Sequence, residues 1–148
     1  MNLIDARRIA FASERSPRSM HFIIEGNPIP LARPRMSKDG HVWDSQKAQK
    51  LIVALELQRQ FKDHPIFTSA LGISLLFYFD MPTRLSKKSK DGTIGKPVTK
   101  RPDTDNLIKF YLDCANDIIF TDDSIVTQIY AEKLYGERPR VEILIGEL

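Results

Sequence analysis

The residues whose types and spacing best suit chemistry lie between Arg101 and Lys109, in the run R-P-D-T-D-N-L-I-K. Asp103 and Asp105 stand two positions apart, and the apolar periodicity that follows predicts a helix opening at Asp103 or Thr104. The turn into this helix lets the two carboxylates converge, and a helix N-terminus favours negative charge. Because Asp105 and Lys109 are four residues apart, we expect them to be neighbours on one helix face.

A second acidic pair, Asp122 and Asp123, follows the same predicted helix within the run F-T-D-D-S. A helix of about twelve residues is about 18 Å long. Asp123 therefore reaches Asp103 only if the chain after Asn116 folds back along the helix, and the apolar residues 118–120 allow such a return.

These side chains together predict a site for a hard cation. Carboxylate oxygens favour Mg²⁺, with Mn²⁺ as a substitute, and the candidate ligands are Asp103, Asp105, Asp123 and, as a less certain member, Asp122. Zinc is disfavoured because the three histidines are scattered and Cys114 is the only cysteine. Phosphodiester hydrolysis needs cations that hold a polyanion and a metal that activates water, and a basic segment leads directly into this acidic set.

The positive charge of the chain is concentrated in two segments. The net charge of +3 divides into +5 for residues 84–109, +3 for residues 33–50 and −5 for the remainder. Such a distribution is typical of a surface for nucleic acid, although a solvated lysine-rich loop is the alternative. The candidate DNA-binding residues are Arg33, Arg35, Lys87, Lys88, Lys90, Lys96, Lys100 and Arg101.

Each of these features also has an interpretation without function. Asp103 and Asp105 can be helix caps, and the Asp122–Ser124 segment can be a simple turn. Cys114 reads as a small core residue rather than a nucleophile, and Trp43 reads as a packing residue rather than a platform for bases. The co-occurrence of several such features in one short stretch favours the functional interpretation.

The elements that must position these residues belong to one domain. A chain of 148 residues has about one domain's length and needs neither metal nor disulfide for folding. A membrane-spanning helix needs about 18 apolar residues, and every apolar run in this sequence is much shorter, so we expect no membrane partner. A single cysteine fits a reducing cytoplasm.

Apolar and β-branched patterns predict strands at residues 20–25, 71–80, 125–135 and 140–145. Ser45 is the predicted N-cap of a first helix, whose buried face is expected to hold Ala48, Leu51, Ile52, Leu55 and Phe61. The second helix is expected to bury Leu107, Tyr111, Cys114, Ala115 and Ile118. Residues 26–40 are predicted as loop or irregular edge, and residues 81–101 as a long connection without periodicity or regular structure.

The resulting order, β-α-β-α-β-β, predicts a single small α/β (α+β) domain with a mixed sheet and two main helices. This domain is expected to span residues 20–148. Residues 1–19 are expected to form an N-terminal extension or arm.

Several runs then point to a known family. K-R-P-D-T-D-N-L-I-K, L-D-C-A-N-D-I-I-F-T-D-D-S-I-V and Y-G-E-R-P-R-V-E-I, with the earlier G-N-P-I-P-L-A-R-P-R, resemble the RusA family of Holliday junction resolvases over about residues 22–145. The resemblance implies a homodimeric, Mg²⁺-dependent endonuclease that nicks four-way DNA junctions symmetrically. It also implies a bacterial or phage-encoded protein that acts in the cytoplasm on the nucleoid.

Individual positions match the family's motifs. Asp103 and Asp105 match its first catalytic carboxylates, Asp123 matches the last, and Lys109 matches its essential lysine. Asp122 falls on the neighbouring acidic position. Two alternatives remain open, namely a non-catalytic protein that binds junctions or duplex DNA, and a broader nuclease acting on flaps or single strands.

Overall fold

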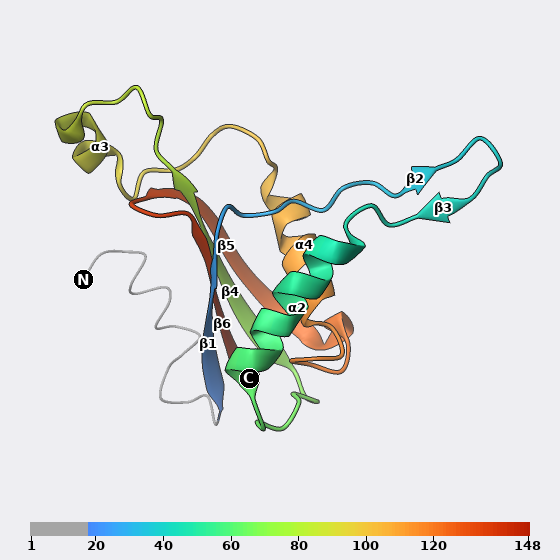
Figure 1. The fold of residues 1–148 in the computed structure, drawn as a ribbon. Coiled ribbons are helices and arrows are strands. Elements are labelled where there is room, and N and C mark those ends of the chain that lie inside the picture. The colour runs from blue at the N-terminus through green and yellow to red at the C-terminus, as the bar shows by residue number, and fades with distance from the viewer. Residues whose placement is uncertain (1–17) are drawn as a thin grey trace.

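Two helices pack on one face of a four-stranded sheet (Figure 1). The computed structural model describes residues 18–148, so the predicted extension lies outside the described residues except for Arg18 and Ser19. The strands are β1 (Ser19–Glu25), β4 (Leu71–Asp80), β5 (Val126–Gly136) and β6 (Arg140–Glu147), and the two helices are α2 (Lys47–Phe61) and α4 (Thr104–Ala115). The predicted single domain with a mixed sheet is confirmed.

The sheet has the strand order β1-β6-β4-β5. β4 pairs in parallel with β5, whereas β6 pairs antiparallel with both β4 and β1. All residues of β4 from Leu71 to Phe77 are buried, as its continuous apolar run predicts. This strand therefore forms the centre of the core on which the helices pack.

Helix α4 follows its predicted pattern closely. Leu107, Phe110, Tyr111 and Cys114 are buried against the sheet, and the Tyr111 hydroxyl accepts a hydrogen bond from the Ile29 amide at 3.1 Å. Burial raises the pKa of Cys114 to about 12, so its thiol stays protonated at neutral pH. The interpretation of Cys114 as a core residue is confirmed.

Helix α2 differs from its prediction in its start and in its buried face. Its N-cap is Gln46 rather than Ser45, and Val53, Leu57 and Phe61 are the residues it buries. Of the residues expected on the buried face, only Phe61 lies there, and the side chains of Leu51, Ile52 and Leu55 are each more than half exposed. Apolar residues occur on both sides of this helix, so periodicity does not identify the side that faces the core.

The predicted loop at residues 26–40 leads into a small hairpin. Strand β2 (Arg35–Met36) pairs antiparallel with β3 (Val42–Trp43), and Figure 1 shows this hairpin extending away from the sheet. Two-residue strands are too short to produce an alternation that a sequence pattern can reveal. We refer to residues 33–44 as the β2–β3 hairpin.

The long connection at residues 81–101 is also more ordered than its sequence indicates. It contains helix α3 (Lys87–Thr93), at whose N-terminus the Ser86 hydroxyl accepts a hydrogen bond from the Ser89 amide at 3.2 Å. Residues 95–98 then pair with the outer edge of β5, through the Gly95 amide to the Tyr135 carbonyl at 2.8 Å and the Val98 amide to the Lys133 carbonyl at 3.0 Å. The expectation of a connection without structure was therefore wrong.

No helix within residues 18–148 is long and apolar enough to cross a membrane.

Candidate functional site

Asp103 and Asp105 lie at the start of α4 with their carboxylates exposed. Asp103 occupies the N-cap position with extended backbone angles, φ −73° and ψ 143°, but its side chain makes no capping hydrogen bond. Asp105 lies in the first helical turn. Neither side chain has a hydrogen bond or ion pair with any residue in the described part of the chain. The capping interpretation of Asp103 therefore fails, and both carboxylates are available to a ligand.

Lys109 lies one turn further along the same exposed face. The sequence predicts that it neighbours Asp105, and both side chains are exposed. The two do not form an ion pair, and within residues 18–148 Lys109 has no other charged partner. Its ammonium group is thus free to meet an anion brought to the carboxylates.

Lys133, which the sequence analysis does not identify, binds the segment that precedes Asp103. The Nζ of Lys133, on β5, donates hydrogen bonds to the carbonyl of Lys100 at 2.7 Å and to the carbonyl of Pro102 at 2.8 Å. These carbonyls immediately precede Asp103. Lys133 therefore fixes the segment that delivers Asp103 to the helix, and we regard it as a positioning residue.

The base of the β2–β3 hairpin is joined to the same part of α4. The Leu31 amide donates a hydrogen bond to the Asn106 carbonyl at 2.9 Å. The buried side-chain amide of Gln46 accepts from the Ala32 amide at 2.7 Å and donates to the Pro30 carbonyl at 2.8 Å. The segment that leads into the hairpin is therefore anchored beside the first turn of α4.

Asp122 and Asp123 lie at the other end of this helix. After α4 the chain turns back, with the Asp117 amide donating to the Phe120 carbonyl at 2.9 Å, and enters the short 3₁₀ helix η1 (Asp123–Ile125). Asp122 accepts a hydrogen bond from the Ser124 amide at 3.1 Å, and its hydrogen bonds with Ser124 lower its pKa. This geometry supports the turn interpretation for Asp122.

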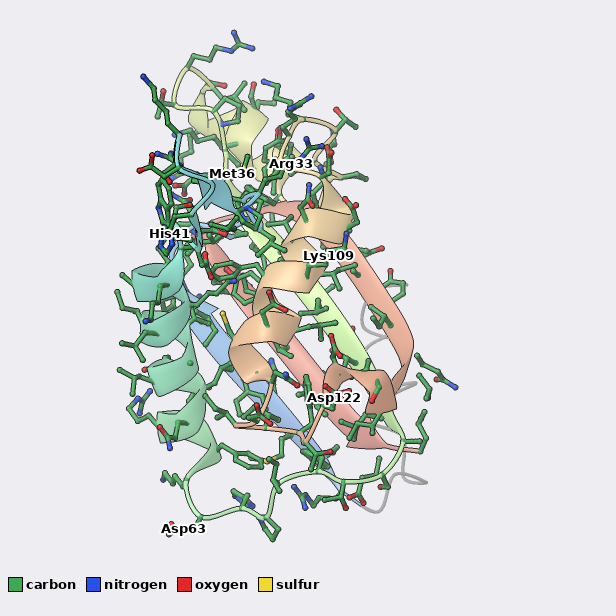
Figure 2. All side chains as sticks on the ribbon, turned by 90° about the vertical axis from the view of Figure 1, so that its right-hand side faces the viewer. Arg33, Met36, His41, Asp63, Lys109 and Asp122 are labelled. Carbon is green, nitrogen blue, oxygen red and sulfur yellow. The ribbon has the colours of Figure 1, made fainter. Side chains whose placement is uncertain are left out.

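Figure 2 shows Lys109 toward the beginning of α4 and Asp122 beside its far end. Within residues 18–148, no group of three or more His, Cys, Asp or Glu side chains could hold a metal ion. The structure thus places Asp103, Asp105 and Lys109 on neighbouring turns of one helix and does not cluster Asp122 and Asp123 with them. The role of Asp123 stays a prediction.

The pair Asp103 and Asp105 fits a magnesium ion by its donor chemistry. Mg²⁺ in proteins is commonly held by one or two carboxylates, while waters and substrate phosphates complete its shell. Two exposed carboxylates that have no other partner among residues 18–148 match this requirement. A site of this kind is open to a phosphodiester from solvent.

The predicted DNA-binding residues surround this end of the molecule. Figure 1 shows α3, the start of α4 and the hairpin at the same end of the sheet. None of these cations forms an ion pair with another residue in the described range. They lie on α3 (Lys87, Lys88 and Lys90), on the connection to α4 (Lys96, Lys100 and Arg101) and on the hairpin (Arg33 and Arg35).

Comparison with known proteins agrees with the motifs. The family model described as "Endodeoxyribonuclease RusA" matches residues 25–146. A curated relative, the uncharacterized protein YqaN of Bacillus subtilis (strain 168), is 36% identical over 137 residues, which cover 86% of this chain and 95% of the relative. The family match includes the hairpin, α4, η1 and the last two strands of the sheet.

Proposed function

Because this chain belongs to the RusA endodeoxyribonuclease family, we propose that it resolves four-way (Holliday) DNA junctions by paired, symmetric, Mg²⁺-dependent nicks. The observation that carries this proposal is the pair of exposed carboxylates at the start of α4, Asp103 and Asp105, which no described residue engages. They lie at the end of the molecule that also carries the cations of α3 and the hairpin. This arrangement suits a backbone phosphate that is held by cations and presented to a metal.

The roles of the site residues follow from their chemistry. Asp103 and Asp105 are the candidate ligands at the helix start, Asp103 serving as a ligand or as the base that orients a water. Asp123 is the remaining position that matches the family's acidic motif, whereas Asp122 is engaged with Ser124 and belongs to the turn. When bound, Mg²⁺ activates water and stabilises the leaving oxygen. Lys109 presents its ammonium group to the charge that develops on the scissile phosphate.

Cleavage in this manner leaves a 5′-phosphate and a 3′-hydroxyl, which are ends that a ligase can rejoin. Manganese is expected to replace magnesium, because both accept carboxylate and water ligands. The cations on α3, the connection and the hairpin contact the arms through phosphates, so binding is expected to fall steeply with salt and to depend little on sequence. We place this activity in the cytoplasm, on chromosomal or phage DNA.

A homodimer follows from the geometry of the substrate. A four-way junction has approximate two-fold symmetry, and a two-fold dimer presents two identical sites to the two strands that must be cut. The exposed side chains of Leu51, Ile52 and Leu55 on α2 give one chain an apolar surface that suits such a contact. We propose that this surface of α2 contributes to the dimer.

A panel of DNA substrates tests the proposed function. The wild-type protein and Asp103→Asn are incubated with a four-way junction, a flap, a duplex and a single strand, with Mg²⁺ or with EDTA. The expected result is cleavage of the junction alone, by the wild-type protein alone, and only with Mg²⁺. Binding without cleavage under any divalent ion favours a non-catalytic DNA-binding protein, and equal cleavage of flaps or single strands favours a broader nuclease.

A further inference from the structure

The β2–β3 hairpin presents the exposed aromatic and cationic side chains of Arg35, His41 and Trp43 on one face. Residues directly opposite each other in an antiparallel pair lie on the same face of the ribbon. Arg35 pairs with Trp43, and the imidazole of His41 stacks on the Trp43 indole, with ring centroids 6.4 Å apart and an interplanar angle of 18°. Trp43 remains 41% exposed, so it is not a residue of the hydrophobic core.

This face lies close to the candidate site. Trp43 lines a hollow of about 290 Å³, which is bounded on the other side by Lys50 of α2 and Asp113 of α4. Asp113 stands four residues after Lys109 and eight after Asp105, so the three share one face of the helix. The side of α4 that carries the carboxylate of Asp105 therefore continues to the hollow beside Trp43.

Hydrogen bonds at both ends of the β2–β3 hairpin hold its aromatic face in place. The amides of Leu31 and Ala32 are hydrogen-bonded to Asn106 and Gln46, as described above. At the other strand, Asp44 accepts hydrogen bonds from the Gln46 amide and from Lys50, both at 2.8 Å. Both ends of the hairpin are thus tied to the helices α2 and α4.

The charges of the hairpin indicate the chemistry of its binding partner. Arg33, Arg35 and Lys38 outnumber the one acidic residue near the tip, Asp39, while Asp44 is neutralised by Lys50. A second positively charged hairpin is a poor partner for such a surface, because like charges repel. A polyanion whose flat, apolar bases are accessible matches both the cations and the aromatic rings.

We propose that the Arg35–His41–Trp43 face of the β2–β3 hairpin stacks on the bases exposed at the branch point of the junction. This inference rests on the proposed function and adds to it a means of selecting the junction. In continuous duplex DNA the bases are stacked on one another and offer no free face to Trp43. At a branch point the stacking is interrupted, so the indole can occupy the place of a neighbouring base.

Trp43 is the only tryptophan of the chain, so tryptophan emission, excited at a wavelength that the four tyrosines do not absorb, reports on this face alone. The wild-type protein is titrated in EDTA, which prevents Mg²⁺-dependent cleavage, with a four-way junction or with duplex DNA of the same arm sequence. Stacking predicts strong quenching by the junction and weaker quenching by the duplex at equal saturation. Emission that is unchanged at saturation with the junction overturns the inference.

Variants test whether the contact has an energetic effect. Trp43→Ala is expected to weaken junction binding at least about fivefold, which corresponds to the lower end of aromatic–base stacking. Duplex binding should change less than junction binding, and Trp43→Phe should recover most of the loss. The matched control is Ile66→Ala, because Ile66 is similarly exposed, at 37%, and follows Asp63 in the loop that Figure 2 shows at the opposite end of the molecule.

The remaining outcomes separate this inference from the proposed function. Normal junction cleavage by Trp43→Ala, with no loss of affinity, overturns the hairpin contact and leaves the nuclease proposal intact. Emission that changes with protein concentration in the absence of DNA, together with monomeric Trp43→Ala, assigns the hairpin to contact with a second copy and also overturns the inference. A wild-type protein that neither binds nor cuts the junction contradicts both proposals.

Discussion

At the residue scale, Asp103 combines a cap position with a side chain that does not cap. Asn at this position removes the charge while keeping the shape, so we expect the unfolding free energy of Asp103→Asn to stay within about 0.5 kcal/mol of wild type. Cleavage of a junction is expected to fall at least about 100-fold, in the range for a lost catalytic carboxylate. Thermal unfolding and single-turnover cleavage measure the two effects.

The matched control for this substitution is Asp117→Asn. Asp117 is an exposed carboxylate just beyond the other end of α4, and its positive φ of 63° is a conformation that Asn also tolerates. Its cleavage rate should equal that of wild type. Asn caps a helix as well as Asp does, so a loss of stability in Asp103→Ala that is absent in Asp103→Asn would restore the capping role.

Lys133 carries the second prediction at this scale. Lys133→Met removes the donor of two hydrogen bonds to the carbonyls before Asp103, so we expect a loss of about 1–3 kcal/mol in unfolding free energy. A loosened Asp103 should also raise the Mg²⁺ concentration needed for half-maximal cleavage, and Lys133→Arg should recover part of both effects. An unchanged Mg²⁺ requirement in a stable Lys133→Met protein would contradict the positioning role.

Residue type and spacing identify some of the site residues but not all of them. Asp103, Asp105 and Lys109 could be proposed because they lie within one helical turn or two of each other. Lys133 could not, because its partners are backbone carbonyls 31 and 33 residues away, which leave no mark in residue type. The exposure of Trp43 could not be predicted either, because an aromatic residue more often packs in a core than lies on a surface.

At the element scale, a helix or strand could be predicted where its sequence is long enough to show a period and where its apolar and polar sides differ clearly. Helix α4 has one apolar face opposite charged residues, so its start and most of its buried residues could be predicted, whereas Ile118 lies beyond the end of the helix and is half-buried. Helix α2 is apolar on two sides, and tertiary packing rather than periodicity selects the buried one. Helix α3 and the β2–β3 hairpin are too short and polar to show a period. The segment after α3 is ordered by hydrogen bonds to β5, and the segment before the hairpin is ordered by hydrogen bonds to Gln46.

A charged network joins the hairpin, α2 and α4 and makes a prediction about pH. The Nζ of Lys50 lies 2.8 Å from the Oδ2 of Asp44 and 3.5 Å from the Oδ2 of Asp113. The hydrogen bond from Lys50, followed by that from the Gln46 amide, lowers the pKa of Asp44 below its ordinary value of 3.8. The stabilisation from the Asp44 charge is therefore complete above that value and is lost as the pH falls through the lowered pKa.

Thermal unfolding of wild type and Asp44→Asn over this range tests the network. Asn keeps an oxygen that can accept from the Gln46 amide, so the comparison isolates the charge. We expect wild type to be more stable at neutral pH and the difference to shrink in acid below the ordinary Asp value of 3.8. A difference that stays constant on acidification would show that the charge of Asp44 adds nothing to stability.

At the scale of the whole molecule, the uneven charge of the sequence becomes an arrangement in space. The two basic segments, which are far apart along the chain, lie with the start of α4 at one end of the sheet (Figure 1). The sequence indicates that cations are concentrated, but only the strand order β1-β6-β4-β5 and the hydrogen bond from Leu31 to Asn106 bring them to the same end. Long-range pairing of this kind cannot be read from local patterns.

The proposed homodimer is also tested at this scale. Ile52 is 69% exposed on α2, so Ile52→Glu should leave the fold intact while placing a charge in the proposed contact. We expect a dimeric wild-type protein and a monomeric variant in light scattering coupled to size exclusion, with Ile66→Glu remaining dimeric. A dimer that persists in Ile52→Glu would assign the contact to another surface.

Cleavage of a supercoiled plasmid that extrudes a cruciform is the sharpest test of paired junction cleavage, because the product records how many strands are cut in one binding event. Two coordinated nicks across the cruciform junction give linear DNA, whereas independent nicks give open circles. We predict linear product with wild-type protein and Mg²⁺, and intact supercoiled plasmid with EDTA or with Asp103→Asn. Supercoiled plasmid that survives wild-type protein with every divalent ion, or equal linearisation by Asp103→Asn, would show that this protein does not resolve junctions through Asp103.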